Sequence, residues 1–203
     1  GFWYRARHKA IIEKTIVNLA QHDRLTGLLL KPAFIERMER SLNGEHPAGS
    51  QSAVILCELT GAPAIAQSHG QDAVDTLILR AADLLAMAAA GKGDIASAGH
   101  GSFLVLVRDV FDPMLVLSLA KEITIQLSAP FEYRGMKLNC QSYSGIALSS
   151  TDGGTAQALV RCAEMALQTA KEQGTPGYGF YNREIAKDAD RLTAVRRAVA
   201  DAT

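Results

Sequence analysis

The spacing of apolar residues along the chain predicts helices that alternate with short strands. Apolar residues recur with the period of an amphipathic helix over residues 5–22, from residue 32 onward, and over 74–88, 113–127, 159–170 and 192–199. Short apolar runs of strand length occur at 54–59, within 94–108 and 131–148, and at 178–181. Polar stretches that contain Gly and Pro separate these elements and predict loops.

The stretch 94–108 is predicted to form a hairpin around which the fold is organised. A β-branched apolar run follows Gly99, His100 and Gly101, a pattern that predicts strand, tight turn and strand. The two glycines permit positive φ at the tip and a close approach of another group. The tip is therefore either a plain turn, which is the commoner case, or a platform for a small ligand. A second hairpin is predicted over 131–148, with a bulge at Gly145.

The order of these elements predicts an α+β fold. It corresponds to a ferredoxin-like β-α-β-β-α-β unit, with helices that flank a mostly antiparallel central sheet. The continuous apolar run at 54–59 is expected to be a buried central strand, with Glu58 near its carboxyl end. Asp112 is expected to cap the helix that follows it, because Pro113 favours the first helical turn.

Composition narrows the setting of the protein. The 203 residues suit one domain with helical extensions, and 21 basic residues balance 21 acidic ones, which argues against a nucleic-acid groove. Three widely spaced cysteines in apolar segments predict buried thiols in a reducing, cytoplasmic compartment: Cys57, Cys140 and Cys162. Residues 2–9 place aromatic side chains before basic ones, as at the cytoplasmic exit of a membrane helix or at the start of an ordinary amphipathic helix.

Four motifs then occur in a recognisable order. D-R-L-T-G-L stands at 23–28, S-G-I-A at 144–147, an alanine-rich helix with a lysine before its final glycine at 163–174, and F-Y at 180–181. In this order the chain resembles a GGDEF domain, the domain of bacterial diguanylate cyclases, over about residues 20–182. The resemblance implies the nucleotidyl-cyclase palm fold. It divides the chain into an N-terminal signalling helix (1–22), a degenerate GGDEF domain (23–182) and a linker helix (183–203).

The resemblance also shows what this chain lacks. The family's signature aligns with five residues that contain no carboxylate: Gly99, His100, Gly101, Ser102 and Phe103. The upstream acidic segment aligns with 58–63, which keeps only Glu58 as an acid and has no phosphate-facing lysine. The family's product-inhibition motif, R-x-x-D, is absent from 90–94. Mg²⁺ in proteins is usually held by one or two carboxylates together with substrate oxygens, so cyclase activity is expected to be lost.

Three positions retain the residue types of a nucleotide site. Glu58 would support a nucleotide, Asp75 would read a guanine edge, and Lys171 would contact phosphate, although Ala66 replaces the guanine-reading asparagine. Each also has an ordinary explanation, namely a solvated acid at a strand end, a surface acid in a first helical turn, and a lysine near a helix carboxyl end. His100 is expected to be exposed at the hairpin tip rather than to bind a ligand or metal.

The sequence thus predicts a catalytically inactive, regulatory and dimerising GGDEF-like domain. The seam formed by Ile12, Ile16 and Leu19 would pair two copies, and 191–198 resembles the linker that joins GGDEF to EAL phosphodiesterase domains. A downstream EAL-type domain in the parent protein and an upstream membrane segment would be the partners. No cofactor is predicted. Two alternatives remain, an allosteric module that binds GTP and Mg²⁺ weakly, and a residual cyclase that converts GTP to cyclic di-GMP.

Overall fold

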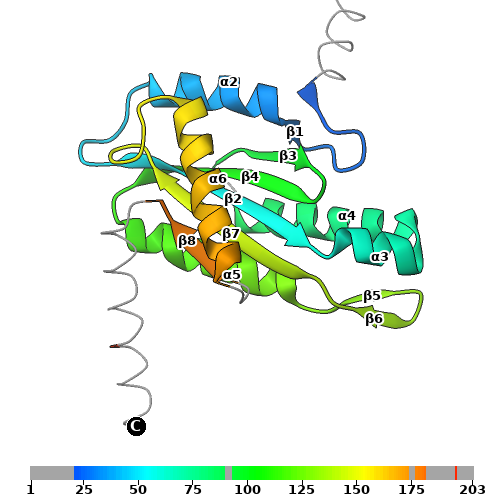
Figure 1. Ribbon diagram of the computed structural model, residues 1–203. Helices are drawn as coiled ribbons and strands as arrows, with labels where there is room; N and C mark the ends of the chain where they lie inside the picture. Colours follow the sequence, from blue (N-terminus) through cyan, green and yellow to red (C-terminus); the bar gives the residue numbers. More distant parts are fainter. Residues whose placement is uncertain (1–20, 90–92, 174–176, 182–194, 196–203) are drawn as a thin grey trace, which may run out of the picture.

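The computed structural model of the chain describes residues 21–89, 93–173, 177–181 and 195. Its strands form one six-stranded sheet in the order β1-β3-β4-β2-β7-β8 and a separate two-stranded hairpin, β5-β6 (Figure 1). The strands are β1 (Leu29–Leu30), β2 (Gln51–Thr60), β3 (Ile95–Gly99), β4 (Ser102–Val110), β5 (Phe131–Tyr133), β6 (Met136–Leu138), β7 (Gln141–Leu148) and β8 (Gly177–Phe180).

The central strand of the sheet is β2, which pairs with β4 on one side and β7 on the other. Leu56 lies opposite Leu104 of β4 and opposite Gly145 of β7. These two pairings and the β3–β4 pairing are antiparallel, whereas the outer pairings β1–β3 and β7–β8 are parallel. The predicted buried central strand and mostly antiparallel sheet are therefore confirmed.

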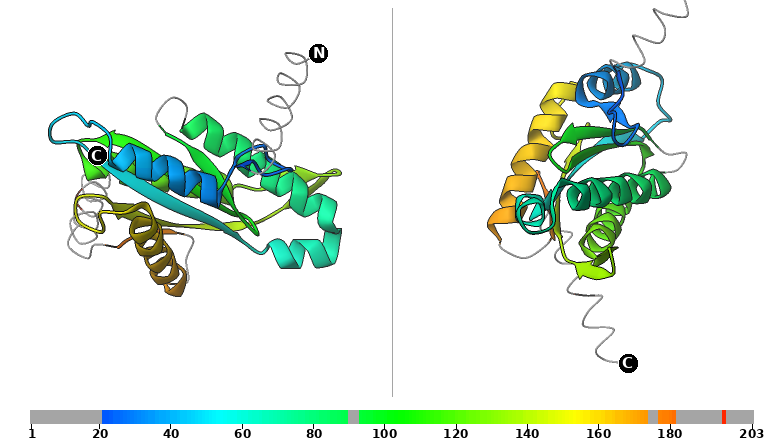
Figure 2. Two further views of the ribbon diagram at one scale, coloured as in Figure 1. Left: turned by 90° about the horizontal axis from the view of Figure 1, so that it is seen from above. Right: turned by 90° about the vertical axis from the view of Figure 1, so that its right-hand side faces the viewer.

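Helices cover both faces of the sheet. They are α2 (Lys31–Leu42), α3 (Ala62–His69), α4 (Gln71–Ala88), α5 (Pro113–Ser128) and α6 (Ala156–Glu172). Figure 2 shows α2 and α6 on one side of the sheet and α4 and α5 on the other. The α+β fold with flanking helices is thus confirmed.

Alternate residues of β2 supply the two hydrophobic cores. Ala53, Ile55 and Cys57 are buried in the core with α4 and α5, whereas Val54 and Leu56 are buried in the core with α2 and α6. Successive side chains of a strand point to opposite faces, so a strand covered on both faces is apolar along its whole length. This explains why 54–59 appears in the sequence as a continuous apolar run rather than an alternating one.

The structure divides one predicted element differently. A single long helix is predicted after residues 60–63, but the chain forms α3 and then α4, with Gly70 between them at φ 86°. Such a positive φ ends a right-handed helix and is readily adopted by glycine. The predicted apolar spacing of 74–88 holds within α4, which ends at Ala88.

The bulge predicted at Gly145 is wrong. Gly145 pairs in unbroken register with Leu56, and its position is instead a point of close packing with α6. A Cβ at Gly145 would lie 2.0 Å from the carbonyl oxygen of Ala163 and 2.4 Å from the backbone nitrogen of Leu167. Glycine is required here because the backbones of β7 and α6 approach one another too closely for any side chain.

The second predicted hairpin is shorter than expected. β5 and β6 turn at Arg134 and Gly135 as predicted, but residues 141–148 form β7 of the main sheet.

The predicted cap of α5 is confirmed, since the Asp112 side chain accepts a hydrogen bond from the backbone N–H of Met114 at 2.9 Å. The predicted terminal helices over 5–22 and 192–199 lie almost entirely outside the described residues.

Among the described residues, no helix combines the length and the hydropathy that crossing a bilayer requires.

Candidate functional site

The tip of the β3–β4 hairpin adopts left-handed backbone conformations throughout. Gly99, His100 and Gly101 have φ values of 85°, 51° and 78°. Glycine adopts this region without strain, whereas the histidine between them adopts a conformation that L-residues seldom occupy. His100 is exposed, as predicted. The tip therefore presents backbone and an imidazole to the surroundings, and it carries no carboxylate.

Glu58 is held beside this tip by strand register. It lies directly opposite Ser102, the first residue of β4, and opposed residues of an antiparallel pair project from the same face. The next residue, Leu59, donates its backbone N–H to the carbonyl oxygen of Gly101 at 3.0 Å, which anchors the tip to β2. The Glu58 carboxylate and the aligned signature position Ser102 therefore belong to one site.

Lys171 reaches the same site from α6. Its Nζ lies 2.8 Å from Oε1 of Glu58, and the two side chains are 32% and 27% exposed. The helix is placed there by a stripe of small and apolar residues that pack on the sheet, namely Ala163, Ala166, Leu167 and Ala170. Because Lys171 follows the last residue of this stripe, packing of α6 brings its ammonium to the exposed end of β2.

Asp75 does not join this pair. It lies on α4, the helix layer on the other face of the sheet, and its Oδ1 accepts a hydrogen bond from Nε2 of Gln71 at 2.8 Å. It is one turn inside α4 rather than in the first turn as expected, since the helix begins at Gln71. Ala66, which aligns with the guanine-reading asparagine, lies on α3 and packs partly against the core. Of the three retained residues, the structure thus brings together Glu58 and Lys171.

The residues at this site do not fit a divalent cation. Within the described ranges, no group of three or more His, Cys, Asp and Glu side chains could hold a metal ion. Glu58 is a single carboxylate, and the lysine ammonium already neutralises it at 2.8 Å. Mg²⁺ requires near-octahedral oxygen coordination, and a lysine can only donate hydrogen bonds. The site can hold one internal ion pair and present hydrogen-bond donors.

Two of the three cysteines are buried as predicted. Cys57 is a residue of β2 whose side chain is fully buried in the core. Burial raises its pKa to about 12, although a hydrogen bond from the hydroxyl of Ser144 partly offsets this rise. Burial likewise raises the pKa of Cys140 to about 11. Cys162 is half-buried, and burial raises its pKa as well. Thiols with raised pKa values are poor nucleophiles near neutral pH, because little of the thiol is present as thiolate.

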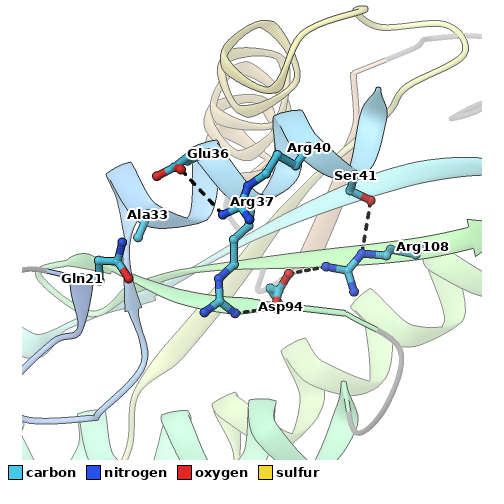
Figure 3. Close-up of a pocket in the computed structure, with 8 residues that line it drawn as sticks. All are labelled: Gln21, Ala33, Glu36, Arg37, Arg40, Ser41, Asp94 and Arg108. Atoms are coloured by element: carbon cyan, nitrogen blue, oxygen red, sulfur yellow. Dashed lines mark hydrogen bonds and ion pairs between the residues drawn. The ribbon is translucent and has the colours of Figure 1, made fainter. Parts of the chain in front are cut away.

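A charged groove that the sequence analysis did not predict lies between α2 and the far end of the β3–β4 hairpin. Arg37 and Arg40 come from α2, Arg108 from β4, and Asp94 immediately precedes β3 (Figure 3). Nothing in the local sequence connects these positions, because the fold alone brings together residues that are 57 and 14 positions apart. Arg108 and Asp109, which follow the apolar run of β4, are local indications that this strand end is charged.

Comparison with known proteins identifies related sequences. The family model described as "Diguanylate cyclase, GGDEF domain" matches residues 20–176. A signaling protein of Caulobacter vibrioides is 33% identical over 180 residues, which is 88% of this chain and 22% of that protein. The bifunctional diguanylate cyclase/cyclic di-GMP phosphodiesterase MucR of Pseudomonas aeruginosa is 26% identical over 87% of this chain and 26% of its own length. The cyclic di-GMP phosphodiesterase PdeR of Escherichia coli is 27% identical over 82% of this chain and 25% of its own length.

The chain therefore spans about a quarter of the length of these relatives.

Solved structures are similar to this chain as well. A sensory box/GGDEF family protein from Caulobacter crescentus superposes with a TM-score of 0.71 at 32% identity, covering 75% of this chain and 99% of that one. The GGDEF domain of TpbB from Pseudomonas aeruginosa gives a TM-score of 0.75 at 25% identity, over 85% of this chain and 99% of that one. With the fold, the ordered motifs and these matches in agreement, the chain belongs to the GGDEF domain family.

Proposed function

We propose that this domain is a catalytically inactive GGDEF domain that regulates a cyclic di-GMP signalling protein. The observation that carries the proposal is the ion pair between Lys171 and Glu58 beside a signature tip that contains no carboxylate. The ammonium of Lys171 neutralises Glu58, which is the one carboxylate that the aligned segments keep for a metal ion. Formation of cyclic di-GMP requires phosphoryl transfer from GTP, a reaction that depends on metal ions and positioned charge.

The missing charged residues favour loss of cyclase activity. Removing a single group that stabilises transition-state charge typically costs about 2.7 to 4 kcal/mol. In this chain Gly101 and Ser102 stand where the family carries two signature carboxylates, and residues 175–176 replace an arginine and an asparagine. Even without additivity, losses at several positions remove most of the rate enhancement that such a site provides.

The names of the relatives support a role in cyclic di-GMP signalling. MucR is named as a bifunctional cyclase and phosphodiesterase, and PdeR as a cyclic di-GMP phosphodiesterase. This chain corresponds to about a quarter of each. Together with the resemblance of residues 191–198 to a linker, this supports a parent protein in which the domain relays a signal to a downstream EAL-type domain.

Incubation with GTP tests the catalytic part of the proposal. The chain would be incubated with GTP and either Mg²⁺ or Mn²⁺, and the products separated by chromatography and identified by mass. We expect no cyclic di-GMP under conditions in which the GGDEF domain of the diguanylate cyclase TpbB makes it. Turnover by this chain that exceeds the rate without protein would refute the proposal.

The dimerising part of the proposal rests on the apolar seam in residues 5–22. Sedimentation equilibrium is expected to give a dimer for the chain. Replacing Ile12 and Leu19 by Asp should give a monomer, because charges in a coiled-coil seam oppose pairing. Asn18→Asp, outside the seam, is the matched control and should leave the dimer intact. A monomer in the unaltered chain would contradict this part.

A second candidate function is an allosteric module that binds GTP without converting it. It is favoured by the retention of Asp75 and Lys171, both of which remain partly exposed. GTP would have to compete with Glu58 for the ammonium, so Glu58→Gln should tighten binding and Lys171→Ala should abolish it. Isothermal titration measures both effects. Absence of heat at millimolar GTP for the unaltered chain and for Glu58→Gln excludes this candidate.

A further inference from the structure

The charged groove between α2 and the β3–β4 hairpin is separate from the candidate nucleotide site. Asp94 precedes β3 and Arg108 lies toward the end of β4, whereas Gly99 and Ser102 form the opposite end of the same hairpin. The groove has a volume of about 510 Å³. This lies within the range of roughly 300 to 1,000 Å³ that is typical of small-molecule sites.

Three guanidinium groups line this groove against two carboxylates. Arg37 donates from Nη1 to Oδ1 of Asp94 at 3.2 Å, and Arg108 donates from Nη2 to Oδ2 of the same carboxylate. Arg108 also donates from Nε to the hydroxyl of Ser41 at 3.2 Å. Asp94 is thus shared between two arginines, and its side chain is 18% exposed. One carboxylate neutralises at most one of them, so the Arg37–Asp94–Arg108 cluster keeps a positive charge.

The third arginine adds to this positive charge. Arg40 Nη2 lies 3.7 Å from Oε1 of Glu36 on the same helix, and both side chains are about two-thirds exposed. Exposed ion pairs of this kind contribute little and exchange readily with water or other anions. In Figure 3, Arg37 and Arg108 approach Asp94 from either side, with Arg40 on the adjacent turn of α2.

Arginine offers more hydrogen bonds than these contacts use. A guanidinium carries five N–H donors in a planar fork. The contacts described above use one donor of Arg37 and two of Arg108. The side chains that line the groove carry a net charge of +1, from three arginines against Glu36 and Asp94. Planar forks of this kind match the oxygen geometry of phosphate groups, often through two parallel hydrogen bonds.

We propose that this groove binds the phosphate group of a soluble, phosphate-bearing small molecule. Arg37 and Arg108 would bind the phosphate with their free N–H groups, and Arg40 would leave Glu36 to complete the contact. Asp94 acts as the internal counter-ion that keeps the two inner arginines in place. The arginines come from α2 and β4, and they do not belong to the family's product-inhibition motif, which this chain lacks.

Titration with pyrophosphate tests the proposal, with binding followed by calorimetry and by the side-chain Nε–Hε signals of arginine in NMR spectra. We expect saturable binding that Arg40→Gln weakens about tenfold, the usual effect of losing a charge-assisted hydrogen bond. Asp94→Asn should strengthen binding by a similar factor, because it removes the competing carboxylate. Unfolding curves of both variants confirm that they fold.

Two controls assign the binding to this groove. Arg134→Gln removes an exposed arginine that is paired with Asp72 at 3.5 Å on another part of the surface, and it should leave the affinity unchanged. Lys171→Met alters the candidate nucleotide site and should also leave it unchanged. Loss of binding in Lys171→Met, or equal affinity in Arg40→Gln and the unaltered chain, would overturn the proposal.

Vesicles distinguish a soluble ligand from a lipid headgroup that carries the same phosphate chemistry. Vesicles of phosphatidylcholine with and without phosphatidic acid would be sedimented with the chain and with Arg40→Gln. We expect no co-sedimentation that depends on Arg40. If Arg40 is needed for binding to phosphatidic acid while pyrophosphate does not bind, the ligand is a membrane surface and the proposal of a soluble ligand is wrong.

Discussion

Lys171 Nζ lies 2.8 Å from Oε1 of Glu58, and this ion pair joins residues that are 113 positions apart. Both residues stand at positions that the resemblance to GGDEF domains assigns to a nucleotide site. In this chain they bind one another, so the ammonium of Lys171 is the counter-charge of the Glu58 carboxylate. The end of β2 is thereby fastened to the last turn of α6. The candidate site thus contributes a link between two elements of the fold.

The first prediction concerns the strength of this link. Lys171→Met should lower the free energy of unfolding by about 1 kcal/mol, because it leaves the Glu58 carboxylate partly buried without its counter-charge. Chemical denaturation in urea measures this change. The pair is only about two-thirds buried, so the loss should shrink at high salt, which screens exposed charges.

A double-mutant cycle provides the control for this prediction. Glu58→Gln in the Lys171→Met background should cost less than Glu58→Gln alone, since the interaction is already lost. Lys137→Met, on the separate β5–β6 hairpin, is the matched removal of a lysine and should have little effect. Additive effects of the two substitutions at 58 and 171 would show that the ion pair contributes nothing.

The second prediction concerns the contact between β7 and α6. Gly145→Ala should destabilise the domain by more than about 3 kcal/mol, the upper range of overpacking, because its Cβ would overlap the backbone of α6. Backbone atoms cannot move aside as a flexible side chain can. Displacing α6 would also carry Lys171 away from Glu58. Gly154→Ala is the control, since a Cβ there would meet no atom within 4 Å and its φ is not in the left-handed region. Similar melting temperatures for the two variants would contradict this prediction.

Gly145 also shows what sequence reasoning could and could not supply. A strand near it was predictable, because the apolar residues Ile146, Ala147 and Leu148 follow it, and so was the helix 159–170 from its apolar spacing. A glycine inside a strand has several possible causes, however, and the sequence favoured a bulge over a close helix contact. The distinction depends on the distance between two backbones, which no local pattern encodes. A glycine inside a helical pattern is ambiguous as well, because it can either continue or end the helix, and for this reason α3 and α4, which Gly70 separates, were predicted as one helix.

The candidate site was predictable in part. Glu58 and Lys171 were identified through the resemblance, and the register of β2 with β4 places Glu58 beside the predicted hairpin tip. That the two charges would pair with one another was not predicted, because the orientation of α6 on the sheet is a tertiary property. The arginine groove was missed for the same reason, since Arg37 and Arg108 meet only through Asp94. Whether these residues bind a ligand stays a prediction.

The third prediction concerns partial restoration of the signature. Gly101→Asp returns a carboxylate to the tip, but φ at this position is 78°, which costs an L-residue about 1 kcal/mol. We expect a modest loss of stability and still no cyclic di-GMP, because Ser102 and the paired Glu58 leave the metal site incomplete. Gly101→Ala should be at least as destabilising, since alanine has no side-chain oxygen to bond the local backbone. Measurable cyclase activity in Gly101→Asp would show that one carboxylate suffices.

The last prediction follows from the buried thiol of Cys57. Burial raises its pKa from an ordinary value of 9.0 to about 12. Between these values the unfolded chain releases the thiol proton and the folded chain keeps it, so the unfolded state is favoured as pH rises. This contribution to stability is fully present below pH 9.0 and is lost as pH approaches 12.

One such group lowers the free energy of unfolding by up to about 1.4 kcal/mol for each pH unit in this window. Urea unfolding between pH 8 and 11 under reducing conditions should therefore show a shallower pH dependence for Cys57→Ala than for the unaltered chain. Titration of tyrosine and lysine affects both proteins alike and cancels in the comparison. Cys57→Ala loses some stability at every pH because a smaller side chain leaves a cavity, so the slope and not the offset carries the result. Cys162→Ala is the control, because its thiol is only half-buried, and it should change the slope less. If the free energies of unfolding of Cys57→Ala and of the unaltered chain run parallel with pH, the buried thiol ionises as easily as an exposed one and the prediction is wrong.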